Sequence, residues 1–102
     1  MITSKQRASL RALANTMQPI TQVGKSGVSE EVCKSVDSAL EAHELIKLNV
    51  LETAGVSARE AAVTIAEATG ADVVAIIGRR FVLFRVSSKP ENRKISAELK
   101  IK

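Results

Sequence analysis

Aromatic residues, cysteine and histidine are scarce in this 102-residue sequence. There are two Phe, no Tyr and no Trp, so the core must be built from aliphatic side chains. The single cysteine, Cys33, excludes an internal disulfide and a cysteine-based metal site, and suits a reducing compartment. The single histidine, His43, has no second histidine with which to bind a metal ion. We therefore expect no metal and no cofactor.

Long apolar runs are also missing. No stretch approaches the roughly 18 apolar residues of a membrane span, and the N-terminus has no apolar signal-peptide core. Hydrophobic residues still make up 45% of the chain, which is enough for one modest globular core. We expect a single soluble, cytoplasmic domain without a membrane partner, and a monomer.

Charge is unevenly distributed along the chain. Residues 1–25 carry four bases and no acid, residues 26–72 three bases and nine acids, and residues 73–102 eight bases and two acids. The three segments therefore carry net charges of +4, −6 and +6. Such segregation can produce one basic and one acidic face, and a basic face would attract a polyanion. The alternative is that both faces are simply solvated.

Hydrophobic periodicity and capping residues predict the element order α-β-α-β-α-β-β. Helices are expected over residues 3–15, 29–42 and 57–69, because Thr3, Ser29 and Ser57 are good N-caps and Gly70 is a typical C-terminal stop. Strands are expected over residues 20–24, 45–51, 73–77 and 81–86. Residues 87–102 form a basic segment that we expect to be poorly ordered.

The strand pattern predicts an α/β fold with a four-stranded mixed sheet packed against helices. The nearly continuous apolar run at residues 73–77 is typical of a central strand covered on both faces. The turn at Gly78, Arg79 and Arg80 joins it to the next strand as a hairpin.

Catalytic candidates are weak. Gly24-Lys25-Ser26 has the last letters of a P-loop, but that motif needs a glycine where Pro19 stands. His43 follows a helix end, where a structural role is commoner than a catalytic one, and Cys33 is expected to be buried. The adjacent pair Glu30-Glu31 complements a helix dipole. We expect no enzymatic activity.

Two loops are candidates for binding a polyanion. Gly24-Lys25-Ser26-Gly27 places two glycines and a cation before a helix start, where backbone N–H groups and the helix dipole favour phosphate. Arg79 and Arg80 project from a tight turn, which suits phosphate binding as well as it suits a solubilising turn. Because the strands lack aromatics, base stacking cannot dominate, and contacts to a nucleic-acid backbone are favoured.

Residues 1–86 resemble the CRM domain, specifically the stand-alone bacterial YhbY-type RNA-binding proteins. The matching segments occur in the family's order and spacing: Lys5-Gln6-Arg7, Leu10, Leu13-Ala14, Pro19-Ile20, Val23-Gly24-Lys25-Ser26-Gly27-Val28, His43-Glu44-Leu45-Ile46-Lys47, Ala68-Thr69-Gly70-Ala71, Ile77-Gly78-Arg79-Arg80 and Val82-Leu83-Phe84-Arg85. Phe81 stands where a second GxxG motif would end with glycine.

The resemblance implies a fold like the C-terminal domain of bacterial translation initiation factor three. It also implies RNA binding through a GxxG loop compared with that of KH domains, and association with precursors of the large ribosomal subunit. The predicted RNA-binding residues are Gly24, Lys25, Ser26, Gly27, Arg79, Arg80, Lys5, Arg7, Arg11 and Arg85. Two alternatives remain: a module that binds a basic ribosomal protein through its acidic face, and an RNA-modifying enzyme, for which candidate residues are lacking.

Overall fold

Helix boundaries in the computed structural model, which describes residues 2–101, follow the capping residues. Thr3 and Gln6 form a complete capping box, because each side chain accepts a hydrogen bond from the other residue's backbone N–H. Ser29 and Ser57 each accept from the backbone N–H three residues later. Gly70 ends its helix in the left-handed conformation. All four predicted boundaries are confirmed.

The elements follow the predicted order as far as residue 84 and continue beyond it. The helices are α1 (Ser4–Ala14), α2 (Glu30–His43), α3 (Ala58–Thr69) and α4 (Lys94–Glu98), with 3-10 turns η1 (Glu52–Ala54) and η2 (Pro90–Asn92). The strands are β1 (Thr21–Val23), β2 (Leu45–Val50), β3 (Asp72–Ile77) and β4 (Arg80–Phe84). No helix within residues 2–101 combines the length and apolar character needed to cross a bilayer.

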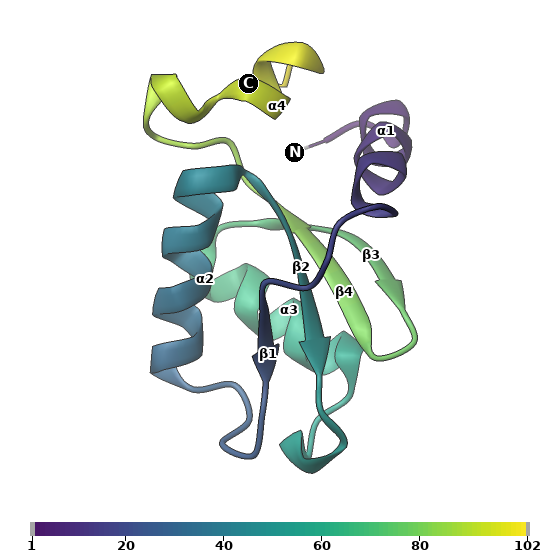
Figure 1. Ribbon diagram of the computed structural model, residues 1–102, viewed down its shortest axis with the longest axis vertical. Coiled ribbons are helices and arrows are strands. Elements are labelled where there is room, and N and C mark those ends of the chain that lie inside the picture. Colours follow the sequence, from purple (N-terminus) through teal and green to yellow (C-terminus); the bar gives the residue numbers. More distant parts are fainter. Residues whose placement is uncertain (1, 102) are drawn as a thin grey trace.

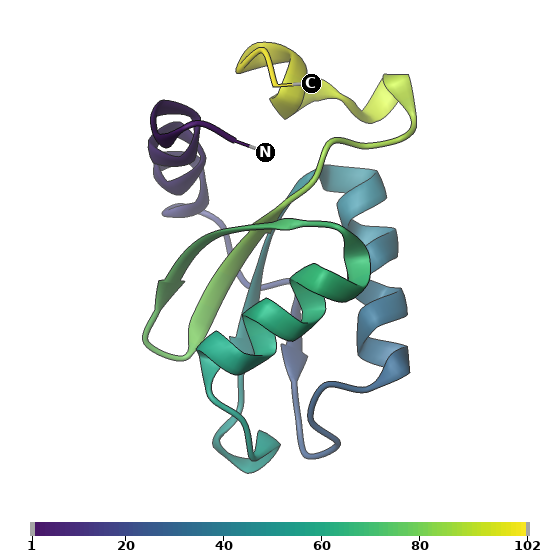
Figure 2. The same cartoon turned by 180° about the vertical axis from the view of Figure 1, so that it is seen from behind.

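The strands form one mixed sheet in the order β1-β2-β4-β3, as the α/β interpretation predicts. β1 runs parallel to β2, whereas β4 runs antiparallel to both β2 and β3. Figure 1 looks onto the sheet face that α1 partly covers, and Figure 2 shows α3 lying across the opposite face. The lower half of the face seen in Figure 1 carries no helix.

The prediction that residues 73–77 form a central strand was wrong, because β3 lies at the sheet edge and β4 lies inside it. The apolar run nevertheless packs on both faces. Val73 and Ile76 join the core under α2 and α3, while Val74 and Ala75 join the core under α1. A register shift between Val73 and Ala75 marks a β-bulge. Two-sided packing at an edge thus has the same sequence signature as a central strand.

Residues 87–101 also differ from the expectation of a poorly ordered tail. They form η2 and α4 and return over the α1 side of the sheet, where α4 lies near α1 (Figure 1). Ile95, Leu99 and Ile101 pack in the same apolar cluster as Leu10 and Phe84. Three aliphatic residues among many charges thus help to attach this segment to the domain.

A buried carboxylate, that of Glu44, fixes the C-terminal segment. Glu44 is fully buried immediately after α2, with a backbone φ of +65° that residues with side chains rarely adopt. Its carboxylate accepts from the backbone N–H of Ser87 at 2.8 Å, from that of Ser96 at 3.0 Å and from the Ser96 hydroxyl at 2.7 Å. These three hydrogen bonds compensate the buried carboxyl group for its loss of water.

Arg85 and Glu41 form a second attachment beside it. The Arg85 guanidinium donates to Asp37 Oδ1 at 2.6 Å, to the Thr69 carbonyl at 2.6 Å and to Glu41 Oε1 at 3.1 Å. Glu41 in turn accepts hydrogen bonds from both the side chain and the backbone of Ser88. These Ser88 bonds, aided by Arg85, lower the pKa of Glu41 below its usual value.

Replacing Glu44 with alanine should destabilise the protein by about 1–3 kcal/mol, because Ser87 and Ser96 would keep buried donors without an acceptor. Urea denaturation measures this loss, and hydrogen exchange of the Ser96 amide should accelerate with it. The exposed Glu98→Ala variant is the control and should change stability little. Equal losses in the two variants would contradict the role assigned to Glu44.

Glu41→Gln should remove part of the acid sensitivity of folding. Because folding lowers the pKa of Glu41, the ionised carboxylate stabilises the folded state at pH values above the usual glutamate pKa of 4.5, and this contribution is lost as pH falls through the lower folded pKa. The unfolding free energies of wild type and variant should therefore converge below about pH 4.5. Parallel curves in denaturant titrations from pH 7 to pH 3 would contradict this, and Glu98→Gln should parallel wild type.

Candidate nucleic-acid interface

The Gly24–Gly27 loop is a tight turn that follows β1. The Gly27 N–H donates to the Gly24 carbonyl at 2.8 Å, and Gly27 has a φ of +67°. A Cβ atom at Gly27 would also lie 3.4 Å from the Ala54 carbonyl oxygen of η1. Glycine therefore meets two requirements there, one of conformation and one of space. Lys25 and Ser26 stand exposed at the tip of the turn.

This tip offers donors to an anion. Within residues 2–101, the backbone N–H groups of Lys25 and Ser26 donate to no protein acceptor. The start of α2 is less available, because the Ser29 side chain already caps it and Glu30 and Glu31 occupy its first turn. These carboxylates balance the helix dipole, so the turn itself and the Lys25 ammonium are the better anion-binding groups.

The second predicted loop is the β3–β4 turn. Gly78 has a φ of +61°, and the carbonyl of Arg79 accepts a hydrogen bond from the Val50 N–H at 2.7 Å. This bond fixes the turn to the end of β2. Arg79 and Arg80 are both exposed. Arg79 Nε lies 3.9 Å from a carboxylate oxygen of Glu52, a long and solvated pair that constrains it weakly.

Both predicted loops lie at one end of the sheet. Val23 accepts from the Leu51 N–H at 2.9 Å on one side of β2, and Arg79 accepts from Val50 on the other. The Gly24–Gly27 loop and the Arg79–Arg80 turn therefore flank η1, at the lower end of the molecule in Figure 1. We call this the loop end.

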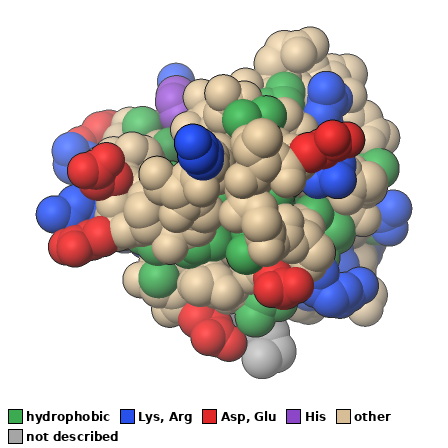
Figure 3. Space-filling view, turned by 90° about the horizontal axis from the view of Figure 1, so that it is seen from below, with side chains coloured by type: hydrophobic (Ala, Val, Ile, Leu, Met, Phe, Trp, Pro, Cys, Tyr) green, Lys and Arg blue, Asp and Glu red, His purple; other side chains and the backbone are tan. Residues whose placement is uncertain are grey.

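Charges at the loop end do not form a field of a single sign. Figure 3 views the molecule from this end and shows Lys and Arg side chains interspersed with Asp and Glu. Glu30, Glu31 and Glu52 are among the exposed acids near the two loops. The predicted separation into a basic and an acidic face does not extend to this view, so binding there would depend on individual cations.

The three predicted cations of α1 lie elsewhere, because α1 packs at the other end of the sheet (Figure 1). Lys5 and Arg11 are exposed on that helix. Arg7 is held within the fold, because its guanidinium donates a hydrogen bond to the Val73 carbonyl at the β3 bulge. The two residues are 66 positions apart in the sequence, so periodicity along α1 could not predict this contact.

Arg85 is not at the loop end and is not available to a ligand. Its side chain is only 17% exposed and binds two carboxylates and two backbone carbonyls. The prediction that it adds charge to an RNA surface therefore conflicts with its place in the fold. Gln22 of β1 and Asn49 of β2 were not singled out from the sequence, although each is a polar residue between apolar or partly buried neighbours on a short strand.

Comparison with known proteins gives a consistent set of relatives. The probable RNA-binding protein YqeI of Bacillus subtilis is 38% identical over 95 residues, which cover 93% of this chain and 97% of that protein. An RNA-binding protein of Haemophilus influenzae is 32% identical over 88 residues, covering 86% of this chain and 89% of its own.

A solved structure also matches. It is the solution structure of SAV1595 from Staphylococcus aureus, a hypothetical protein reported as an RNA-binding candidate. Its TM-score is 0.72 at 37% identity, over 92% of this chain and 98% of that one. Residues 2–85 match the model of the CRS1 / YhbY (CRM) domain. On this match, and on the fold that carries it, the chain belongs to the CRS1 / YhbY (CRM) domain family.

Proposed function

We propose that this protein binds RNA without catalysing a reaction, and that it holds the RNA backbone at the loop end. Gly24, Lys25, Ser26 and Gly27 would form one contact and Arg79 and Arg80 the other. The observation that carries the proposal is the position of these two exposed loops on either side of η1. The names of the relatives, which refer to RNA binding, support the same ligand.

The chemistry of the two loops suits phosphate groups. Free N–H groups at the tip of the Gly24–Gly27 turn can donate to phosphate oxygens, and the Lys25 ammonium supplies charge beside them. Across η1, the planar guanidinium groups of Arg79 and Arg80 can each bind a phosphate in a bidentate manner. Phosphates of one strand would then contact both loops.

For the RNA itself we propose ribosomal RNA in precursors of the large subunit, with a role in ribosome assembly in the cytoplasm. This follows from the resemblance of residues 1–86 to YhbY-type proteins. The competing hypothesis, docking of a basic protein on the acidic segment, is weakened by the fold. Asp37, Glu41 and Glu44 are already bonded within the domain, so fewer free carboxylates remain for a basic partner.

The double variant Arg79→Ala/Arg80→Ala should weaken RNA binding and lower its salt dependence. Each lost phosphate contact should reduce the slope of log K against log salt by about 0.7–0.9. Fluorescence anisotropy with a labelled RNA at several salt concentrations measures both quantities. Lys89→Ala/Lys94→Ala is the matched control, because it removes two exposed cations at the opposite end. Equal losses in both double variants would indicate diffuse attraction and contradict the proposed site.

Crosslinking of the protein to RNA in its native cells, followed by sequencing, should enrich large-subunit precursor RNA. Enrichment should fall in the Arg79→Ala/Arg80→Ala variant and persist in the Lys89→Ala/Lys94→Ala control. Enrichment of a different RNA would contradict the ribosomal assignment alone. Recovery of no RNA above background would contradict RNA binding as well.

A further inference from the structure

Four side chains form a row across the uncovered half of the sheet. Gln22 of β1 pairs in register with Asn49 of β2, Asn49 pairs with Arg80 of β4, and Arg80 pairs with Ile77 of β3. Residues paired in register project from the same face of a sheet. At about 4.8 Å between strands, the row is about 14 Å long. We call it the polar row.

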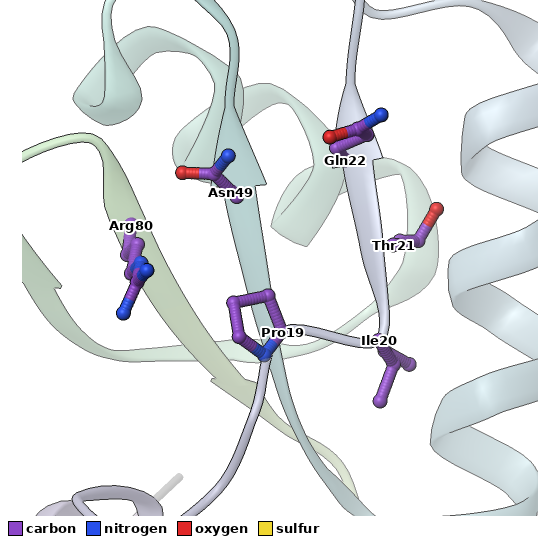
Figure 4. A pocket seen from close by; sticks show the side chains of 6 residues that line it. All are labelled: Pro19, Ile20, Thr21, Gln22, Asn49 and Arg80. Carbon is purple, nitrogen blue, oxygen red and sulfur yellow. The ribbon is translucent and has the colours of Figure 1, made fainter.

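The polar row is open to solvent. It lies on the face that α1 covers only at the other end (Figure 1). Gln22, Asn49 and Arg80 line a groove of about 520 Å³, and Pro19 and Ile20 form its border. Figure 4 shows these side chains on three neighbouring strands, with Pro19 beside them. Ile77 at the row's end is 55% exposed, which is unusual for a large aliphatic side chain on a strand.

The chemistry of the polar row suits nucleobases. The side-chain amides of Gln22 and Asn49 each present both donors and an acceptor, the combination that recognises base edges. The Arg80 guanidinium plane and the exposed Ile77 can contact base faces. The row contains no acid. Within residues 2–101, neither side-chain amide forms a hydrogen bond to another protein group, so both are available to a ligand.

Lys47 adds a cation to the same face. It lies on β2 two residues before Asn49, and only 8% of its surface is exposed. Within residues 2–101 its ammonium group forms no ion pair with a carboxylate. Because no buried side-chain nitrogen within residues 2–101 lacks a hydrogen-bond partner, the unbonded Lys47 ammonium reaches solvent at the end of its buried stem. This face is thus suited to a negatively charged ligand.

We propose that the polar row binds unpaired bases of single-stranded RNA and discriminates between them, while the loop end holds the backbone. Arg80 belongs to both, since it starts β4 at the loop end. The inference rests on the proposed RNA-binding function, but it adds a property that backbone contacts cannot give. Phosphate contacts carry no sequence information, whereas amide contacts to base edges do.

The test uses the full chain and four labelled RNA homopolymers of twelve nucleotides, one for each base. Wild type should bind them with different affinities. Gln22→Ala/Asn49→Ala should reduce the ratio between the tightest and the weakest by about tenfold, with an unchanged salt slope because no charge is lost. Asn15→Ala, at the exposed end of α1, is the matched control and should keep the wild-type ratio.

A second measurement does not depend on the stability of any variant. In wild type, the side-chain amide NMR signals of Gln22 and Asn49 should shift on adding the preferred homopolymer, while those of Asn15 stay in place. Equal affinity of wild type for all four RNAs, an unchanged ratio in the double variant, or unshifted amide signals would each overturn the inference and leave RNA binding standing. Failure of wild type to bind any RNA would overturn both.

Discussion

Pairing of β2 with different strands on its two edges is the interaction on which the rest of the structure depends. β1 pairs with it in parallel and β4 in antiparallel orientation, so the end of β1 and the start of β4 meet at the end of β2. Two hydrogen bonds at consecutive residues, from Val50 to Arg79 and from Leu51 to Val23, complete the junction. Loops separated by about fifty residues in the chain thereby flank η1.

Successive side chains of β2 point to opposite faces of the sheet, and the two faces have different roles. Ile46, Leu48 and Val50 are directed into the core under α2 and α3, whereas Lys47 and Asn49 occupy the other face. That face holds an apolar cluster only where α1 and the C-terminal segment cover it. One strand therefore supports the core, positions the loop end and carries the centre of the polar row. A one-residue slip in its register would disrupt all three.

Features set by local chemistry could be predicted from the sequence. Caps such as Thr3 and Ser57 depend on groups three residues away, so their signals were sufficient. Features set by tertiary contacts could not. The bonds of Arg85 to Asp37, of Arg7 to β3 and of Glu44 to Ser96 each join segments that are distant in the sequence. The sequence therefore does not show whether an arginine is free to bind a ligand or is hydrogen-bonded within the fold. The sequence could not show that β3 is an edge strand, because both faces of a strand can be packed at the edge of a sheet as well as at its centre.

The contact between Arg7 and the β3 bulge has a consequence for how copies of the protein behave when crowded. An edge strand offers unpaired backbone groups to which another chain can add, and a long RNA with many bound copies would bring such edges close together. Here the bulge interrupts the regular spacing of the backbone groups, and the Arg7 guanidinium donates a hydrogen bond to the Val73 carbonyl. The edge therefore does not present the even ladder that self-pairing requires. Arg7, which the sequence predicts as an RNA contact, thus also contacts the backbone of the sheet's edge strand.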